Sequence, residues 1–358
     1  MKITILGAGN GGVAAAADWS ISGHEVSLFD FEGFGNQIEI IKKNGGIYAE
    51  GDIDGFAPIK YAGHSIEEAI IDAELIMAIG PAYSTVPFAE AMKPFIKPGQ
   101  DVIVCPGSCG GAFLFKKALG LDFDDSSIIV AETSTLPYAC RITEPGHVHV
   151  YLKLKGGFYI STLPSSEIDR VHEVFCQVYD FTEKAKNVFQ TILQNGNPVI
   201  HPVVTLLNAG RIESTKGNFF FYEDGVMPSV GRLMKAVDEE RVNIGNALGV
   251  EVLSDPDLGI NQGYMTSNDY ETGYSSAPGF KGIKAQSQLD HRYLNEDVGY
   301  GLVFMTELAD KLNIATPVMD AVICIASSVM ERDYRTERKR SLKTLGLDQY
   351  SIDKLKSL

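Results

Sequence analysis

Basic side chains, cysteines and long apolar runs are all scarce in this sequence. Its 358 residues include 31 lysines and arginines against 46 aspartates and glutamates, which gives a formal net charge of -15. Such an acidic balance disfavours nucleic acid or an anionic membrane surface as the main partner. Small anionic substrates remain compatible with it, because a few local arginines are enough to hold one.

Only five cysteines occur, and an odd count without a dense framework is typical of a reducing compartment. No uncharged run approaches membrane-spanning length, and no basic-then-apolar leader stands before the first apolar run. These absences predict a cytoplasmic enzyme, and the length favours two domains over one. The oligomeric state stays open, with a homodimer among the options.

The first twelve residues, MKITILGAGNGG, carry the most informative pattern. The apolar run at residues 3–6 is typical of a buried parallel strand, and a G-x-G-x-x-G motif with four alanines follows it. In such a turn the first glycine permits the bend, the second admits a pyrophosphate, and the third lets helix and strand pack closely. The predicted dinucleotide contacts of this turn are Gly7, Gly9, Asn10, Gly11 and Gly12.

A second predicted strand, residues 24–30, ends in Asp30, which lies 18 residues beyond Gly12. A carboxylate at that distance is expected to accept hydrogen bonds from an adenosine ribose. Residues 31–36 hold no arginine or lysine for a 2′-phosphate, so we expect NAD with a preference for NADH, although NADP stays open. The alternative to a dinucleotide site is an ordinary glycine turn with an acidic residue at a strand end. The occurrence of strand, turn, helix, strand and acid in that order favours the dinucleotide site.

Short strands and helices alternate as far as residue 184, which predicts an α/β domain with a parallel sheet of the Rossmann type over residues 1–184. Ligands of such sheets bind where the strands end. We therefore predict cofactor contacts at Pro81, Ala82 and Gly107 and a substrate contact at Thr133. His147 and His149 share one face of a strand, but no second ligand cluster accompanies them, and no metal site is predicted.

After residue 184 the pattern changes to helical periodicity, which predicts an all-helical domain over residues 185–358. Its first segment carries a polar stripe at helical spacing: Gln194, Asn197, His201, Thr205 and Asn208. Pro198 and Pro202 are expected to kink the helix beside His201 and to aim the imidazole into a cleft. A satisfied core histidine at a helix bend explains the same spacing equally well.

A later segment, LDHRYLNEDVGYGL, predicts a helix with Asn295 as its N-cap. Asp297 then falls in the first helical turn, and Arg292 lies just before it. Without a catalytic role, Asp297 would be a carboxylate that complements the helix dipole, and Arg292 would be a solvated loop charge. The tyrosine-rich stretch within residues 261–285 fits either a substrate lid or a mobile surface loop.

Several stretches together resemble the octopine and nopaline (opine) dehydrogenases: the glycine motif, ETSTLPYACR, NPVIHP with TLLNAGRIES, and HRYLNED. The nearest resemblance is to the bacterial N-(1-D-carboxyethyl)-L-norvaline dehydrogenases, and it covers essentially the whole chain. It implies a 6-phosphogluconate-dehydrogenase-like architecture with the active site between the two domains. It also implies NAD(P)H-dependent reductive condensation of a 2-oxo acid, such as pyruvate, with the amino group of an amino acid.

The same resemblance assigns roles to particular residues. It implies a catalytic histidine at His201, a carboxylate paired with it at Asp297, and an arginine for a substrate carboxylate at Arg292. Asn197 and Asn208 are expected substrate contacts on the polar stripe. If Asp297 hydrogen-bonds the ring, we expect the pKa of His201 to lie above its usual value of about 6.5.

Two other functions are compatible with parts of the pattern. Related two-domain dehydrogenases, acting on 2-hydroxy acids, glycerol 3-phosphate or ketopantoate, usually place a lysine at the catalytic step. The polar stripe at 194–208 contains no lysine, which counts against them. A non-catalytic dinucleotide-binding protein would not need His201, Asp297 and Arg292 together.

Overall fold

The computed structural model describes residues 1–337 and 339–358, and they form two compact units. One unit comprises residues 1–154, 158–191 and 358, and the other comprises residues 155–157 and 192–357. The predicted boundary after residue 184 coincides with the end of a strand, and helix α7 (Val188–Leu193) contributes residues to both units. In the described part of the chain, no helix is both long enough and apolar enough to span a membrane.

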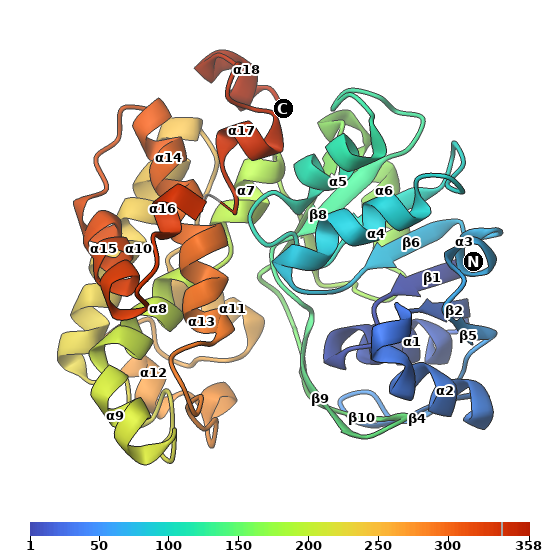
Figure 1. Ribbon diagram of the computed structural model, residues 1–358, viewed down its shortest axis with the longest axis horizontal. Coiled ribbons are helices and arrows are strands. Elements are labelled where there is room, and N and C mark those ends of the chain that lie inside the picture. Colours follow the sequence, from blue (N-terminus) through green and yellow to red (C-terminus); the bar gives the residue numbers. More distant parts are fainter. Residues whose placement is uncertain (338) are drawn as a thin grey trace. The chain divides into compact units, whose positions relative to one another are not determined.

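The first unit is built on an eight-stranded sheet in the order β12-β11-β8-β7-β6-β1-β2-β5 (Figure 1). Neighbouring strands pair in parallel, except β8 and β11, which are antiparallel. This confirms the predicted parallel-rich α/β architecture. The strands are β1 (Lys2–Leu6), β2 (Glu25–Phe29), β5 (Tyr61–Gly63), β6 (Leu75–Ala78), β7 (Asp101–Val104), β8 (Val130–Thr133), β11 (Phe158–Leu163) and β12 (Thr182–Lys184).

The helices of this unit lie between the strands in sequence, as the alternating pattern predicts. They are α1 (Asn10–Ile21), η1 (Glu32–Phe34), α2 (Gly35–Asn44), α3 (Ile66–Ile70), η2 (Ala82–Ser84), α4 (Thr85–Met92), α5 (Gly111–Leu119), η3 (Ser165–Glu167) and α6 (Ile168–Phe175). Most of these helices are short, so they are stabilised by packing on the sheet rather than by the intrinsic helix propensity of their residues.

A second sheet in the same unit has the order β4-β3-β10-β9. It joins two hairpins, β3 (Gly46–Gly51) with β4 (Gly55–Pro58) and β9 (Tyr138–Glu144) with β10 (His147–Lys153), through parallel pairing of β3 with β10. Helix α1 contacts strands of both sheets. Its run of alanines, residues 14–17, is therefore fully buried on every side, as expected for a helix without a polar face.

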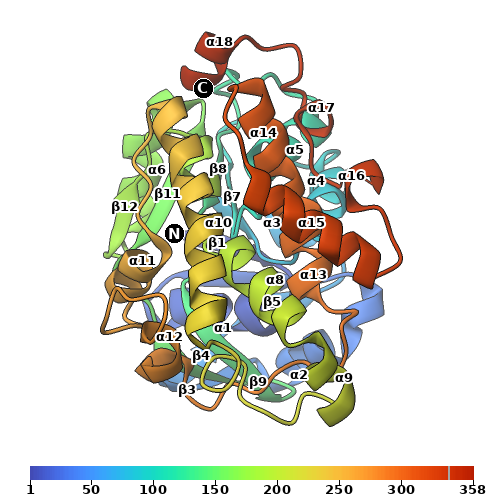
Figure 2. The same ribbon diagram turned by 90° about the vertical axis from the view of Figure 1, so that its left-hand side faces the viewer.

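The second unit is helical, as predicted, with one isolated antiparallel bridge between Phe220 and Lys284. Helix α8, which carries His201, packs against the long helix α10, as Figure 2 shows, and against α13, α15 and η5. The elements after α7 are α8 (Asn197–Leu207), α9 (Ala209–Thr215), α10 (Pro228–Leu248), α11 (Asp255–Gln262), α12 (Gly273–Ser276), η4 (Pro278–Phe280), α13 (Arg292–Asn295), the π-helix η5 (Asp297–Leu302), α14 (Val303–Lys311), α15 (Pro317–Val329), α16 (Tyr334–Glu337), α17 (Leu342–Leu345) and α18 (Ile352–Lys356).

A buried arginine on α10 ties several of these helices together. Arg241 is fully buried and pairs with Asp238 at 2.6 Å. Its guanidinium also donates to the carbonyl oxygens of Leu193, at the end of α7, and Leu253, just before α11, the latter at 2.7 Å. A buried charge is tolerated when it is paired and hydrogen-bonded in this way.

A second carboxylate shares the network. The amide of Asp255 donates to Asp238 at 2.8 Å, while the hydroxyls of Tyr270 and Tyr274 donate to Asp238 and Asp255 respectively. Burial, reinforced by the charge of Asp238, raises the pKa of Asp255 to about 7. The single cation of Arg241 therefore compensates two buried acids.

Replacing that cation tests the network. Arg241→Met would leave two acids buried without a positive partner, so we expect the free energy of unfolding to fall by roughly 3–5 kcal/mol. Arg232→Met on the same helix removes an exposed pair with Glu271 and should cost less than about 1 kcal/mol. Denaturant titration of both variants measures the difference, and equal losses would contradict the assigned role of Arg241.

Candidate functional site

The glycine turn of the first unit connects β1 to α1 at the carboxyl edge of the large sheet (Figure 1). Gly7 has φ +104°, a conformation that favours glycine, and its amide donates to the carbonyl of Phe29 at 2.8 Å. A Cβ on Gly12 would lie 1.8 Å from the carbonyl oxygen of Gly7, whereas a Cβ on Gly9 would meet nothing within 4 Å. Gly12 thus serves helix–strand packing, and Gly9 leaves the backbone open to an approaching phosphate.

Asp30 follows β2 and points back at this turn. Its carboxylate accepts the amide of Ala8 at 2.7 Å and that of Phe31 at 2.8 Å. The side chain is buried, and burial raises the pKa of the carboxyl group, although the two amides counteract this. Asp30 therefore shapes the turn itself, in addition to the ribose contact that we predict for it.

Asn10 and Gly11, at the start of α1, contact the rest of the unit. The side-chain oxygen of Asn10 accepts the amide of Ile142 at 2.8 Å, which ties β9 to the turn. A Cβ on Gly11 would come within 2.9 Å of the side chain of Leu136. Their predicted contacts with a cofactor stay predictions.

The other predicted residues of this unit follow β6 and β7 or, in the case of Thr133, end β8, so they lie at the same sheet edge. Pro81 and Ala82 come after β6, and the amide of Gly107, after β7, donates to the carbonyl of Thr133 at 2.9 Å. A Cβ on Gly107 would lie 2.4 Å from the carboxyl carbon of Glu132. A side chain at position 107 would therefore displace the buried carboxyl group of Glu132.

In the second unit, His201 on α8 and Asp297 on η5 form a buried pair. The Nδ1 atom of His201 and a carboxylate oxygen of Asp297 are 2.7 Å apart, and both side chains are more than nine-tenths buried. This confirms the predicted contact between two residues that are 96 positions apart in sequence. A carboxylate on Nδ1 orients the ring and leaves Nε2 for proton exchange.

The helix start predicted at Asn295 is wrong. His291 caps the short helix α13, Asn295 is its last residue, and the chain continues into the π-helix η5 from Asp297. The side chain of Asn295 accepts from Arg332 at 2.6 Å and donates to Asp290 at 2.7 Å, so it is not available as a cap.

The π-helix brings Asp297 to the histidine. A Cβ on Gly301 would lie 2.7 Å from the ring of Pro198 on α8, so a glycine there lets the two elements approach closely. Single π-turns of this kind are frequent at functional sites. Pro198 itself occupies the first turn of α8, where a missing amide costs nothing, so only Pro202 lies inside the helix.

Aromatic side chains surround the imidazole. Tyr293 stacks on it with ring centroids 3.8 Å apart, and Phe221 meets it edge-on at 6.0 Å. The hydroxyl oxygen of Tyr222 lies 3.3 Å from Nε2. Sequence reasoning missed all three as individual residues, although Tyr293 lies within HRYLNED, and Phe221 and Tyr222 lie within residues 213–280, the stretch expected to set the amino donor.

The expected rise in the pKa of His201 is wrong. Burial lowers the pKa of His201 below its usual value, and this effect outweighs the charge of Asp297 and its hydrogen bond, which raise it. The nearby cation of Arg292 lowers it further. A ring so thoroughly removed from water is harder to protonate than one at the surface, even beside a carboxylate.

Arg292 is the first residue of α13 and lies five positions before Asp297. Its side chain is 59% exposed, and its guanidinium is 3.8 Å from Glu296. A guanidinium beside the buried pair, on a side chain that is partly open to solvent, could take a carboxylate with two parallel hydrogen bonds.

The predicted substrate contacts on α8 lie at its two ends. Asn197 begins the helix, and its backbone N–H donates to the side-chain oxygen of Asn195 at 3.1 Å. The side-chain nitrogen of Asn208 donates to the carbonyls of Val204 and Gly225 at 2.9 and 3.0 Å. These bonds hold the end of α8, and a role for either asparagine, or for Thr133, in substrate binding stays a prediction.

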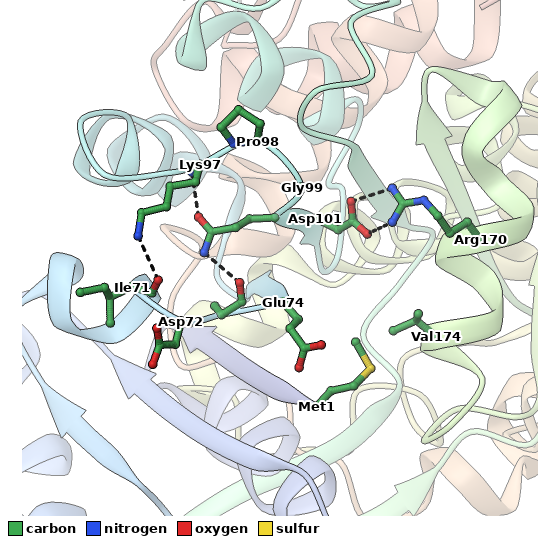
Figure 3. A pocket seen from close by; sticks show the side chains of 12 residues that line it. Met1, Ile71, Asp72, Glu74, Lys97, Pro98, Gly99, Asp101, Arg170 and Val174 are labelled. Atoms are coloured by element: carbon green, nitrogen blue, oxygen red, sulfur yellow. Dashed lines mark hydrogen bonds and ion pairs between the residues drawn. The ribbon is translucent and has the colours of Figure 1, made fainter.

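A cavity of about 410 Å³ lies at the opposite, amino edge of the large sheet (Figure 3). Its charged side chains are engaged locally, because Arg170 pairs with Asp101 at 2.6 Å and Lys97 donates to the carbonyl of Ile71 at 3.3 Å. Nothing in it converges on a ligand. In residues 1–337 and 339–358 no group of three or more potential metal ligands comes together, and His147 and His149 face Glu144 and Glu50 instead.

The opine dehydrogenase of Arthrobacter sp. strain 1C is 35% identical to this chain over 345 residues, which are 96% of this chain and 94% of that protein. The chain belongs to the opine dehydrogenase family. The family model "NAD/NADP octopine/nopaline dehydrogenase, alpha-helical domain" matches residues 184–330. "Protein ocs" of Agrobacterium tumefaciens strain Ach5 is 28% identical over 355 residues, 97% of this chain and 96% of that protein.

The fold is similar to that of a solved octopine dehydrogenase with NADH and L-arginine, with a TM-score of 0.81 at 19% identity. That likeness covers 100% of this chain and 98% of the other. As a member of this family, the chain is an NAD(P)-dependent oxidoreductase, with the Rossmann and helical parts that its sequence predicts. Its glycine turn fits a dinucleotide, because the space above Gly9 is open.

Two glycine substitutions separate the packing role of the turn from its binding role. Gly12→Ala would collide with the Gly7 carbonyl, so we expect a clear loss in Tm. Gly9→Ala meets no atom of the protein and should keep the Tm while weakening NADH binding about tenfold or more, because the methyl group would stand in the predicted path of the phosphate. Thermal melts and NADH fluorescence titrations measure both effects, and normal NADH affinity in Gly9→Ala would contradict this assignment.

Proposed function

We propose that this opine dehydrogenase joins a 2-oxo acid, pyruvate, to the amino group of an amino acid and reduces the resulting imine to a secondary amine. The observation that carries the proposal is the buried His201–Asp297 pair with Arg292 beside it. Family membership favours this chemistry over that of the related 2-hydroxy acid, glycerol 3-phosphate and ketopantoate dehydrogenases and over a non-catalytic protein. The bond formed and reduced is C–N, so the enzyme acts on a CH–NH group.

The reaction needs proton transfer near neutral pH. The amino donor must lose a proton before it attacks the ketone, and water must leave before reduction, while the bound nicotinamide supplies the hydride. His201 is suited to exchange these protons, because burial keeps the imidazole neutral and Asp297 stabilises the imidazolium when it forms. Arg292 holds a substrate carboxylate.

The other predicted site residues set the cofactor and substrate specificity in this proposal. Asp30 would repel a 2′-phosphate, so NADH is the preferred cofactor. Thr133, Asn197 and Asn208 contact the substrates, and residues 213–280 select the amino donor.

Steady-state assays test the reaction class. With pyruvate and a panel of amino acids, we expect NADH oxidation that depends on both substrates, and a higher kcat/KM for NADH than for NADPH. Turnover with pyruvate alone would indicate a 2-hydroxy acid dehydrogenase. If no amino acid supports NADH oxidation with pyruvate, the proposed opine reaction is wrong.

Substitutions at the pair test the mechanism. His201→Ala removes the proton carrier and should lower kcat by about 10²–10⁴ with NADH binding nearly intact. Asp297→Asn loses the charge that raises the pKa of His201, so activity should fall and the histidine limb of the pH–rate profile should move to lower pH.

The matched control is His149→Ala on the small sheet, whose ring is one-third exposed and should be dispensable. A folded His201→Ala enzyme with near wild-type kcat would make His201 a core histidine only. Arg292→Ala should differ from both, mainly by raising the KM for the 2-oxo acid.

A further inference from the structure

Both nitrogens of the His201 ring have partners. Asp297 accepts from Nδ1 at 2.7 Å, and the hydroxyl oxygen of Tyr222 lies 3.3 Å from Nε2. An ionised carboxylate can only accept, so Nδ1 carries the hydrogen in the neutral ring. Nε2 is then the acceptor, and Tyr222 donates to it.

The phenol of Tyr222 is held in place. Its ring stacks on Phe280 with centroids 4.1 Å apart and meets Phe221 edge-on at 5.1 Å. Burial raises the pKa of Tyr222 well above its usual value, so the hydroxyl keeps its proton at neutral pH. It is therefore a permanent donor with little freedom to turn away.

The other surroundings of the imidazole leave few routes to Nε2. Tyr293 stacks closely on the ring, Asp297 occupies Nδ1, and the whole side chain is only 4% exposed. The oxygen of Tyr222, which stands directly at Nε2, has a further lone pair with which it can accept. Bonds of 3.3 Å are long for a hydroxyl donor, but such contacts often tighten when substrate binds.

We propose that Tyr222 is a second catalytic residue beside His201, whose hydroxyl holds the ring as the Nδ1–H tautomer and relays protons between Nε2 and the reacting nitrogen or oxygen. The proposal rests on the proposed function of His201. In the link, the substrate ammonium gives a proton to the Tyr222 oxygen as the hydroxyl proton passes to Nε2. The amine becomes neutral, His201 becomes an imidazolium beside Asp297, and Tyr222 ends as a neutral phenol.

Tyr222→Phe keeps the aromatic stack and removes only the hydroxyl. We expect kcat to fall about tenfold or more, with the Kd for NADH unchanged. The lost bond stabilised the neutral ring, so the histidine limb of the pH–rate profile should move to higher pH, by about one unit. The histidine limb should therefore move in the direction opposite to that expected for Asp297→Asn. A general loss of stability would not produce two opposite shifts of the pH–rate profile.

Tyr179→Phe is the matched control. Tyr179 belongs to the first unit, and its buried hydroxyl is hydrogen-bonded to that of Tyr138 at 2.7 Å. Its variant also loses one buried hydroxyl from an aromatic cluster, and it should keep the wild-type kcat and pH profile. ¹⁵N NMR of histidine-labelled wild-type enzyme, with the His201 signals assigned from the His201→Ala spectrum, should show the Nδ1–H tautomer.

The outcomes separate this inference from the proposed function. If His201→Ala is inactive while Tyr222→Phe has the wild-type kcat and pH profile, the role of Tyr222 is overturned and that of His201 stands. If His201→Ala is active, the proposed mechanism fails first. If Tyr222→Phe does not fold, the wild-type NMR still decides, because an Nε2–H tautomer would overturn the proposal.

Discussion

The candidate site of the second unit is built around one hydrogen bond, between the imidazole of His201 and the carboxylate of Asp297. A carboxylate so nearly buried is costly unless it is hydrogen-bonded, and the ring supplies that bond. Asp297 reaches the ring because the chain forms a π-helix at this point and because Gly301 lets it close on Pro198. The irregular helix and its glycine are therefore parts of the site.

Burial and charge act in opposite directions on this histidine. The carboxylate favours the protonated ring, while removal from water disfavours it, and burial is the stronger effect. The outcome suits the role of proton acceptor that we propose, since burial favours the neutral ring and an imidazolium formed during turnover would still have Asp297 as its counter-ion. Arg292, with a side chain that is 59% exposed, would meet an anionic substrate in the reaction that we propose.

In the first unit, one side chain at the glycine turn is also expected to serve both structure and binding. Asp30 accepts two backbone amides, one of them from Ala8 inside the turn. The acid expected to meet a ribose therefore also holds the loop that is expected to receive the pyrophosphate. A change at Asp30 would alter the shape of the turn as well as cofactor choice.

Short-range features of this protein were determined by the sequence by itself. Glycine spacing, the apolar runs and the alternation of elements specify the strand–turn–helix start, the parallel-rich sheet and the later helices, because backbone sterics and periodicity act over a few residues. Residue identity in HRYLNED and NPVIHP also pointed to the members of the pair. The tertiary structure decided the rest. It joined β3 to β10, placed a π-helix where an ordinary helix start at Asn295 was predicted, and brought Tyr222 to Nε2. It also reversed the expected pKa shift of His201, because desolvation depends on every side chain packed around the ring, and these come from distant parts of the chain.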